Sequence, residues 1–270
     1  MTQRILITGS AGGMGTLMRT RLAAPDRVLR LLDIGEQPPA AEGEAVEVVR
    51  ASVTDQAAMD AVCEGVDAVI HLGGHSLEQP WEQILDVNIN GTHVVLEAAR
   101  RNGVGRVVLA SSNHAVGFYE RSSGEAGDYL FPQPDTYYGV SKVALEALGS
   151  LYASRYGMDV IAVRIGSCFE RPKDARMLAT WLSPDDGARL FEACLSAPSP
   201  GFRVVWGVSD NTRRWFSLDE ARALGYESKD DSEVFAADVP EADPESLAHR
   251  YLGGMWCGPE LDTAVKEAGR

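Results

Sequence analysis

The stretch RILITGSAGGMG, residues 4–15, decides the fold class of this chain. An apolar segment typical of a buried strand leads into a glycine-rich turn, and residues 16–24 follow with helical spacing. Glycine clusters are often no more than turns, but a strand before and a helix after such a turn favour dinucleotide binding, because the helix N-terminus then faces a pyrophosphate. The spacing here is Gly-x-x-Gly-x-x-Gly. We expect the cofactor phosphates to lie against Gly9, Gly12, Gly13, Met14 and Gly15.

Apolar strands and helical stretches alternate along most of the chain. Further strands are expected at residues 28–32, 46–50, 68–72, 106–110, 159–164 and 202–206, and helices at 57–63, 84–101 and 138–156. Because parallel neighbours need crossover connections, this order predicts an α/β fold with a Rossmann-like doubly wound parallel sheet.

Beyond Arg164, apart from the strand at 202–206, the chain is expected to be irregular. Prolines 172, 184, 198 and 200 interrupt it, and it contains neither a repeat nor a low-complexity linker. We expect a single domain over residues 1–270, with a dinucleotide-binding core up to about residue 165 and a small, mostly substrate-covering elaboration from about residue 166.

The composition restricts the partners and the compartment. A net charge of -14 argues against nucleic acid or an anionic membrane as a partner. No apolar run approaches the ~20 residues that span a bilayer. The four cysteines are scattered without a metal-like cluster and the N-terminus leads straight into a strand, which indicates a cytoplasmic protein with no metal. The acidic, lysine-poor surface leaves salt adaptation and ordinary composition both open.

Asp33 ends the second expected strand, about 20 residues after the glycine turn. A carboxylate there would accept hydrogen bonds from the adenosine ribose and repel a 2′-phosphate, which favours NAD over NADP as the cofactor. A loop-capping role for Asp33 is the alternative, and the nearby Arg30 keeps NADP open. The ends of neighbouring strands should line the same crevice and supply Ile34, Ser52, Val53, Leu72, Gly73 and Gly74.

Tyr138 and Lys142 stand one helical turn apart, after the strand that ends in Ser111 and Ser112. A cation beside a tyrosine favours the phenolate; lowering the tyrosine pKa from about 10 to neutrality takes about 4 kcal/mol. Such a pair is common on solvated helices, so the interpretation depends on the glycine turn and Asp33. In that setting Tyr138 would accept a proton from an alcohol, Lys142 would also bind the nicotinamide ribose, and Ser112 would hold the substrate oxygen. Otherwise Ser112 would cap a turn.

Several motifs, in order, resemble those of the extended short-chain dehydrogenase/reductase superfamily. They are TGSAGGMG at 8–15, Asp33, HLGG at 71–74, NINGT at 88–92, SSNH at 111–114 and YGVSK at 138–142. A narrower similarity, to the uronate dehydrogenase family, covers nearly the whole chain. It is carried by HLGGHS at 71–76, ASSNHAVGFY at 110–119, YYGVSK at 137–142, VRIGSCFERP at 163–172, RMLATWLSPDD at 176–186 and VVWG at 204–207.

The resemblance implies NAD-dependent oxidation at C1 of cyclic D-glucuronate or D-galacturonate to an aldarolactone. Arg176 matches the arginine that binds the sugar carboxylate, and its planar fork suits that group; without the resemblance a surface arginine is the better interpretation. The other positions that match substrate contacts are Ser76, Ser112, Asn113, His114 and Ser167. Those assigned to the cofactor are Asn88, Ile165 and Cys168. Ser52 departs from the family, which commonly has aspartate near the adenine.

Two other functions remain open. A nucleotide-sugar epimerase or dehydratase uses the same tyrosine and lysine but retains its NAD, and the region after Arg164 is short for a nucleotide-diphosphate site. A non-catalytic dinucleotide-binding regulator needs no proton acceptor, so the set of Ser112, Tyr138 and Lys142 argues against it. The chain is expected to form a homo-oligomer. Its preference between glucuronate and galacturonate stays open.

Overall fold

The structure of the chain is a computed structural model that describes residues 2–241, 243 and 245–261. Its centre is a seven-stranded sheet in the order β3-β2-β1-β4-β5-β6-β9, and all neighbouring strands are parallel. The strands are β1 (Gln3–Thr8), β2 (Arg27–Asp33), β3 (Val46–Arg50), β4 (Ala68–His71), β5 (Arg106–Ser112), β6 (Asp159–Ile165) and β9 (Phe202–Gly207). The strand order reverses between β1 and β4, which confirms the Rossmann-like doubly wound sheet.

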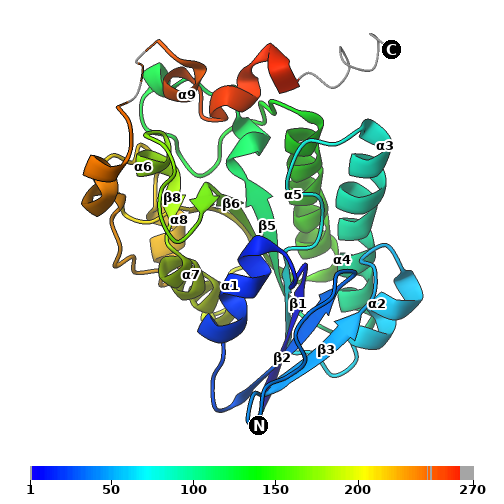
Figure 1. The fold of residues 1–270 in the computed structure, drawn as a ribbon. Helices are drawn as coiled ribbons and strands as arrows, with labels where there is room; N and C mark the ends of the chain where they lie inside the picture. Colours follow the sequence, from blue (N-terminus) through cyan, green and yellow to red (C-terminus); the bar gives the residue numbers. More distant parts are fainter. Residues whose placement is uncertain (1, 242, 244, 262–270) are drawn as a thin grey trace.

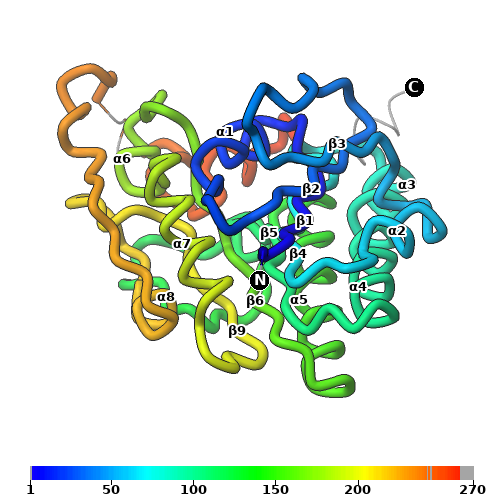
Figure 2. Tube along the Cα trace, turned by 90° about the horizontal axis from the view of Figure 1, so that it is seen from below, coloured from blue at the N-terminus to red at the C-terminus, as the bar shows by residue number. Residues whose placement is uncertain are grey.

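Helices cover both faces of the sheet (Figures 1 and 2). One face carries α1 (Gly13–Arg21), α7 (Pro184–Ser196) and α8 (Asp219–Ala223); the other carries α2 (Gln56–Val62), α4 (Gly91–Arg101) and α5 (Tyr137–Tyr156). The core accordingly forms two clusters of buried apolar residues. One includes Ile5, Ile7 and Phe191, and the other includes Leu6, Val95 and Val107. Alternate residues of β1 therefore belong to different clusters, as expected for a strand buried on both faces.

The expected strands all occur, and their bounds differ from the prediction by at most two residues at either end. The helix expected at 84–101 is longer and less regular. It begins with α3 (Trp81–Gln83), passes through a π-helical segment (Ile84–Asn90) and continues as α4. The helix expected at 16–24 lies three residues earlier, because α1 begins directly in the glycine turn with Gly12 at its N-cap.

The interpretation of residues 184–196 as irregular is wrong, because α7 fills this stretch. Pro184 occupies its first turn, where a missing N–H costs no helical hydrogen bond, and Ser183 caps the helix by accepting a hydrogen bond from the Asp186 N–H. Since α7 and β9 come from the part after residue 165, that part also contributes to the sheet and its cover. The single-domain boundaries and the division near residue 165 stay predictions.

The carboxyl ends of the strands meet at one edge of the sheet, at the top of Figure 1. The segment from α9 (Leu247–Arg250) to residue 261 crosses above this edge and is drawn in red. Shorter elements nearby are β7 (Ser167–Cys168), α6 (Met177–Thr180) and β8 (Trp181–Leu182). The 3-10 turns are Asn113–Val116, Arg121–Ser123, Ser232–Asp238, Gly254–Cys257 and Pro259–Leu261.

Within the described part of the chain, no helix is both long and apolar enough to cross a membrane.

Candidate active site

The glycine turn packs directly on the end of β4. Gly9 has a φ of 71°, and a Cβ on it would lie 2.6 Å from the Gly73 nitrogen. A Cβ on Gly15 would lie 2.4 Å from the Gly9 oxygen. A Cβ on Gly13 would meet nothing within 4 Å, so open space remains above the start of α1. This is a tight turn with a free helix N-terminus, and it fits a pyrophosphate.

Asp33 lies beside this turn at the end of β2. Its Oδ2 accepts a hydrogen bond from the Ala11 N–H at 2.9 Å, and its Oδ1 accepts one from the Gly35 N–H at 2.8 Å. The carboxylate therefore links two loops, which agrees with its alternative capping role. It also lies at the position expected for a group that binds the ribose. Ile34 follows it on the surface with 67% of its area exposed.

The other residues expected near the adenine and ribose lie at the ends of β3 and β4. The Ser52 hydroxyl is 2.8 Å from the Thr54 hydroxyl and also accepts the Thr54 N–H, so it is used in the turn before α2. A Cβ on Gly73 would lie 2.8 Å from Val53 Cγ1, so Gly73 has to lack a side chain for Val53 to pack against it. Leu72 is partly buried and packs against the core.

Asn88 serves as a buried brace between two segments of the site. Its Oδ1 accepts the His75 N–H at 2.8 Å, and its Nδ2 donates to the His75 oxygen at 3.0 Å and the Ser141 hydroxyl at 3.1 Å. The side chain thus fixes the loop after β4, which carries the exposed Ser76, against α5. A direct contact of Asn88 with the cofactor stays a prediction.

Helix α5 begins at Tyr137 because the Thr136 hydroxyl accepts the Gly139 N–H at 3.1 Å. Glu78 also caps this end of the helix, since its two carboxylate oxygens accept hydrogen bonds from the N–H groups of Tyr137 and Tyr138 at 3.1 and 2.7 Å. An anion at a helix N-terminus interacts favourably with the helix dipole. The catalytic candidate Tyr138 is therefore held by a residue of the loop after β4.

Ser112, Tyr138 and Lys142 lie together, as predicted. The Lys142 Nζ is 5.2 Å from the centre of the Tyr138 ring and donates to the Ala110 oxygen at 2.7 Å. The Ser112 hydroxyl accepts the His114 N–H at 3.2 Å, and all three side chains are buried. Ser112 therefore caps the turn and also lies beside Tyr138.

The expectation that Lys142 lowers the Tyr138 pKa stays a prediction. Burial raises the pKa of Tyr138 to about 12, although a hydrogen bond with Ser112 acts in the opposite direction. Burial also lowers the pKa of Lys142 to about 8, and the Glu146 carboxylate offsets part of this effect. Desolvation therefore dominates the pKa shifts of both groups, but a Lys142 pKa of about 8 still leaves the amine mainly charged at pH 7.

Two of the sugar-binding candidates, Asn113 and Arg176, share one hydrogen-bond acceptor. The Asn113 Nδ2 donates to the Leu252 oxygen at 3.2 Å, and the Arg176 Nη2 donates to the same oxygen at 2.6 Å. The hydroxyls of Ser167 and Thr180 are 3.1 Å apart. Ile165 ends β6, and Cys168 follows in β7, where burial raises its thiol pKa to about 12.

Arg176 has no carboxylate among the described residues at ion-pair distance. Its Nε atom is enclosed and has no hydrogen-bond partner in that part of the chain, and burial lowers its pKa. The side chain lines a cavity of about 870 Å³ together with Leu252. Although the charges of Asp174 and Asp135 raise the Arg176 pKa, burial dominates, so an anion in the cavity would stabilise the cation and this position fits a bound carboxylate.

Four features of the site were not predicted from the sequence. They are Glu78, Asp135, the backbone of Leu252 and Trp256. Asp135 stands directly before the cap of α5, in DTYY, so its position in the sequence is a usable signal. Trp256 lies in GGMWCG, where glycines flank an aromatic residue, but only the fold shows which ring it meets.

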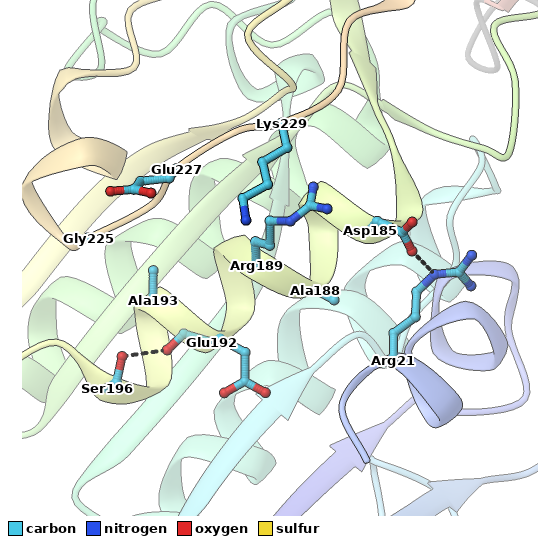
Figure 3. Close-up of a pocket in the computed structure, with 10 residues that line it drawn as sticks. All are labelled: Arg21, Asp185, Ala188, Arg189, Glu192, Ala193, Ser196, Gly225, Glu227 and Lys229. Carbon is cyan, nitrogen blue, oxygen red and sulfur yellow. Dashed lines mark hydrogen bonds and ion pairs between the residues drawn. The ribbon is translucent and has the colours of Figure 1, made fainter. Parts of the chain in front are cut away.

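A different hollow, of about 540 Å³, lies between α1, α7 and the chain after α8 (Figure 3). Both acidic and basic side chains line it, and Arg21 is paired with Asp185 at 2.7 Å. None of its lining residues is a predicted site residue. The strand ends lie beside Ser112, Tyr138 and Lys142 and are therefore the candidate active site, whereas the cavity at Arg176 is lined by no other predicted site residue.

Comparisons with known proteins agree with this geometry. The model of the NAD dependent epimerase/dehydratase family matches residues 5–184. The uronate dehydrogenase of Pseudomonas syringae pv. tomato is 46% identical over 94% of this chain and 92% of its own. The NAD-dependent glucose-6-phosphate dehydrogenase of Haloferax volcanii is 38% identical over 87% of this chain and 96% of its own.

A crystal structure of a uronate dehydrogenase mutant from Agrobacterium tumefaciens, complexed with NAD, is 40% identical to this chain. It superposes with a TM-score of 0.89 and covers 95% of this chain and 97% of that one. The chain therefore belongs to the NAD-dependent epimerase/dehydratase family, in which it groups with the uronate dehydrogenases as an NAD-dependent oxidoreductase.

Proposed function

We propose that this protein oxidises the C1 hydroxyl of cyclic D-glucuronate or D-galacturonate to the corresponding aldarolactone. The observation that carries the proposal is the position of Arg176, a partly buried cation whose enclosed Nε atom has no hydrogen-bond partner in the described chain. Through the Leu252 oxygen it is linked to Asn113, which directly follows Ser112. This shared acceptor supports assigning a proton acceptor and a carboxylate receptor to one site, as a sugar acid requires.

The cofactor phosphates would lie against the turn from Gly9 to Gly15, with Asp33 at the adenosine ribose. Bound NAD supplies the hydride acceptor and a positively charged nicotinamide ring. The nicotinamide side would be formed by Ile165 and Cys168, and Lys142 would hold the second ribose.

Tyr138 is proposed as the general base. In the reaction the C1–H bond breaks with its electron pair as hydride, the anomeric O–H proton passes to the Tyr138 oxygen, and C1 becomes the lactone carbonyl. Ser112 orients the reacting oxygen. Because burial holds the Tyr138 pKa near 12, the phenolate needs positive charge nearby, which Lys142 and the oxidised nicotinamide provide. General-base help of this kind contributes about 10²–10⁴-fold.

The substrate's other groups would meet Ser76, Asn113, His114 and Ser167. Such small polar side chains suit a polyol, since each sugar hydroxyl needs a hydrogen-bond partner when it is removed from water. Arg176 would bind the carboxylate in two parallel hydrogen bonds. The protein is also proposed to work in a reducing cytoplasm, because all four cysteines are free, and to form a homo-oligomer.

The test is NADH formation with free sugars. Purified protein is incubated with NAD and a panel of glucuronate, galacturonate, glucose, glucose 6-phosphate and arabinose, and the product is identified by NMR. We expect NADH and a lactone from the two uronates and little from the neutral sugars. Preference for glucose 6-phosphate would show that the anion site takes phosphate instead. In a separate incubation with a nucleotide sugar, turnover without net NADH would indicate an epimerase or dehydratase, and no turnover with any of these substrates would support a regulator.

A further inference from the structure

The carboxylate of Asp135 is enclosed by glycines from separate segments. Its side chain has no exposed area. A Cβ on Gly117 would lie 1.9 Å from Asp135 Oδ2, and one on Gly253 would lie 2.0 Å from the same atom. A Cβ on Gly139 would lie 3.0 Å from Oδ1. A buried carboxylate is costly unless it is well paired, so the space left for Asp135 needs an explanation.

The main partner of Asp135 is the ring of His114. The Nδ1 atom of His114 lies 2.6 Å from Asp135 Oδ2, while Oδ1 accepts the Thr136 hydroxyl at 3.0 Å. The ring of Trp256 stacks on His114 with centroids 4.0 Å apart. The ring of Tyr138 meets both, at 5.8 Å from His114 and 5.6 Å from Trp256. These contacts fix the orientation of the His114 ring, which lies directly beside the ring of the proposed base, Tyr138.

Burial favours the neutral form of the His114 ring. Burial lowers the His114 pKa more than the Asp135 hydrogen bond and charge raise it; Arg176 lowers it further, and Glu78 raises it. A neutral imidazole carries one N–H, and an ionised carboxylate only accepts hydrogen bonds, so the proton belongs on Nδ1. The Nε2 atom then has a lone pair, and none of the described residues forms a hydrogen bond with it.

We propose that Asp135 is a positioning residue that fixes the His114 tautomer, so that Nε2 accepts a hydrogen bond from a hydroxyl of the bound sugar. The inference rests on the proposed function, because it assigns the partner of Nε2 to the sugar. Trp256 completes the arrangement by preventing the ring from tilting away. Asp135 acts through His114 and does not itself touch the reacting atoms.

A purely structural role for Asp135, as a link to Thr136 at the start of α5, is the competing explanation. The two can be separated because only the positioning role depends on His114. A double-mutant cycle combines Asp135→Asn with His114→Phe and measures kcat and KM for glucuronate. Asp186→Asn is the matched control, since Asp186 is also a fully buried, hydrogen-bonded carboxylate but lies in α7, outside the site.

Asp135→Asn alone should lower kcat/KM about 10- to 100-fold, mainly through KM, since the amide can donate to Nδ1 and move the proton to Nε2. In the His114→Phe background the same change should have no further effect on KM. Asp186→Asn should leave KM unchanged. An equal loss in both backgrounds would overturn the proposal and leave the structural role.

A second measurement is independent of activity and of the folding of any Asp135 variant. ¹⁵N NMR of the ring nitrogens of His114 in the free wild-type protein reports the tautomer directly, with the resonance assigned by its absence from His114→Phe. We expect a protonated Nδ1 and an unprotonated Nε2 at neutral pH. A protonated Nε2 would overturn the proposal even if the enzyme oxidises uronates. Conversely, the expected tautomer without uronate turnover would place the failure in the proposed function.

Discussion

Asn113 and Arg176 donate hydrogen bonds to one backbone oxygen, that of Leu252, at 3.2 and 2.6 Å. This joint acceptor connects the end of β5, the start of α6 and the C-terminal segment above the sheet. The segment is fastened a second time, because the Gly253 N–H donates to the Gly117 oxygen at 2.8 Å. The proposed carboxylate receptor is therefore positioned by a part of the chain that contains no reacting group.

Arg176→Ala should remove discrimination between a sugar acid and its neutral counterpart. Loss of a charge-assisted hydrogen bond costs about 1.5–3 kcal/mol, which corresponds to about 10- to 150-fold in kcat/KM for glucuronate. Steady-state kinetics with glucuronate and glucose measure the ratio. Arg171→Ala, at an exposed arginine 3.9 Å from Asp238, is the control and should change nothing. An unchanged glucuronate-to-glucose ratio in Arg176→Ala would refute the role of the arginine.

Asp33→Ser should shift the cofactor preference towards NADP. The substitution removes the carboxylate that accepts the Ala11 and Gly35 N–H groups. A 2′-phosphate would then no longer be repelled, and the NAD ribose would lose a hydrogen-bond acceptor. We expect NAD affinity to fall and the ratio of kcat/KM for NADP to that for NAD to rise about tenfold or more, for a change of about 1.4 kcal/mol. Fluorescence titration with both cofactors supports the kinetics. A wild-type preference for NADP would contradict this account of Asp33.

Gly9→Ala should destabilise the fold as well as the cofactor site. The new Cβ would lie 2.6 Å from the Gly73 backbone at a φ of 71°, so the expected loss is about 1–3 kcal/mol or more of unfolding free energy. Gly13→Ala is the matched control, because its Cβ meets nothing within 4 Å and lies in a helix. Urea unfolding of both variants measures the difference. Equal stability of Gly9→Ala and wild type would contradict the described turn.

Lys142→Met should change how stability depends on pH. In the folded protein the Lys142 pKa falls from 10.5 to about 8, so between these values the unfolded chain binds more protons. The wild type should therefore gain stability relative to Lys142→Met as pH rises from 8 towards 10.5, by roughly 3 kcal/mol over the window. Urea unfolding at pH 7, 8.5 and 10 follows this difference. A stability difference that is constant across these pH values would show that the lysine is not desolvated.

Most of the sheet follows from the sequence because buried parallel strands are apolar runs that end in glycine or polar residues. Helix α7 is not predicted from the sequence. Pro184 is interpreted there as a break, although proline is well tolerated in the first turn of a helix. The π-helical segment at Ile84–Asn90 also has no clear sequence signal, since it preserves the amphipathic pattern of a long helix.

The candidate site also contains residues that the sequence predicts and contacts that it does not. Gly9, Asp33, Tyr138 and Lys142 are recognisable because their spacing along one or two elements sets their geometry. Contacts between distant segments are not encoded in any local spacing. The stacking of Trp256 on His114 and the enclosure of Asp135 by glycines are of this kind, and so is the desolvation that raises the Tyr138 pKa.

The most direct test of the central claim is Tyr138→Phe, which removes only the proposed proton acceptor. NADH formation with saturating glucuronate and NAD binding by fluorescence titration are measured on the same preparation. We predict that kcat falls about 10²–10⁴-fold while the NAD dissociation constant changes little, because Tyr138 supplies general-base help and not cofactor affinity. A kcat close to that of the wild type would contradict the mechanism.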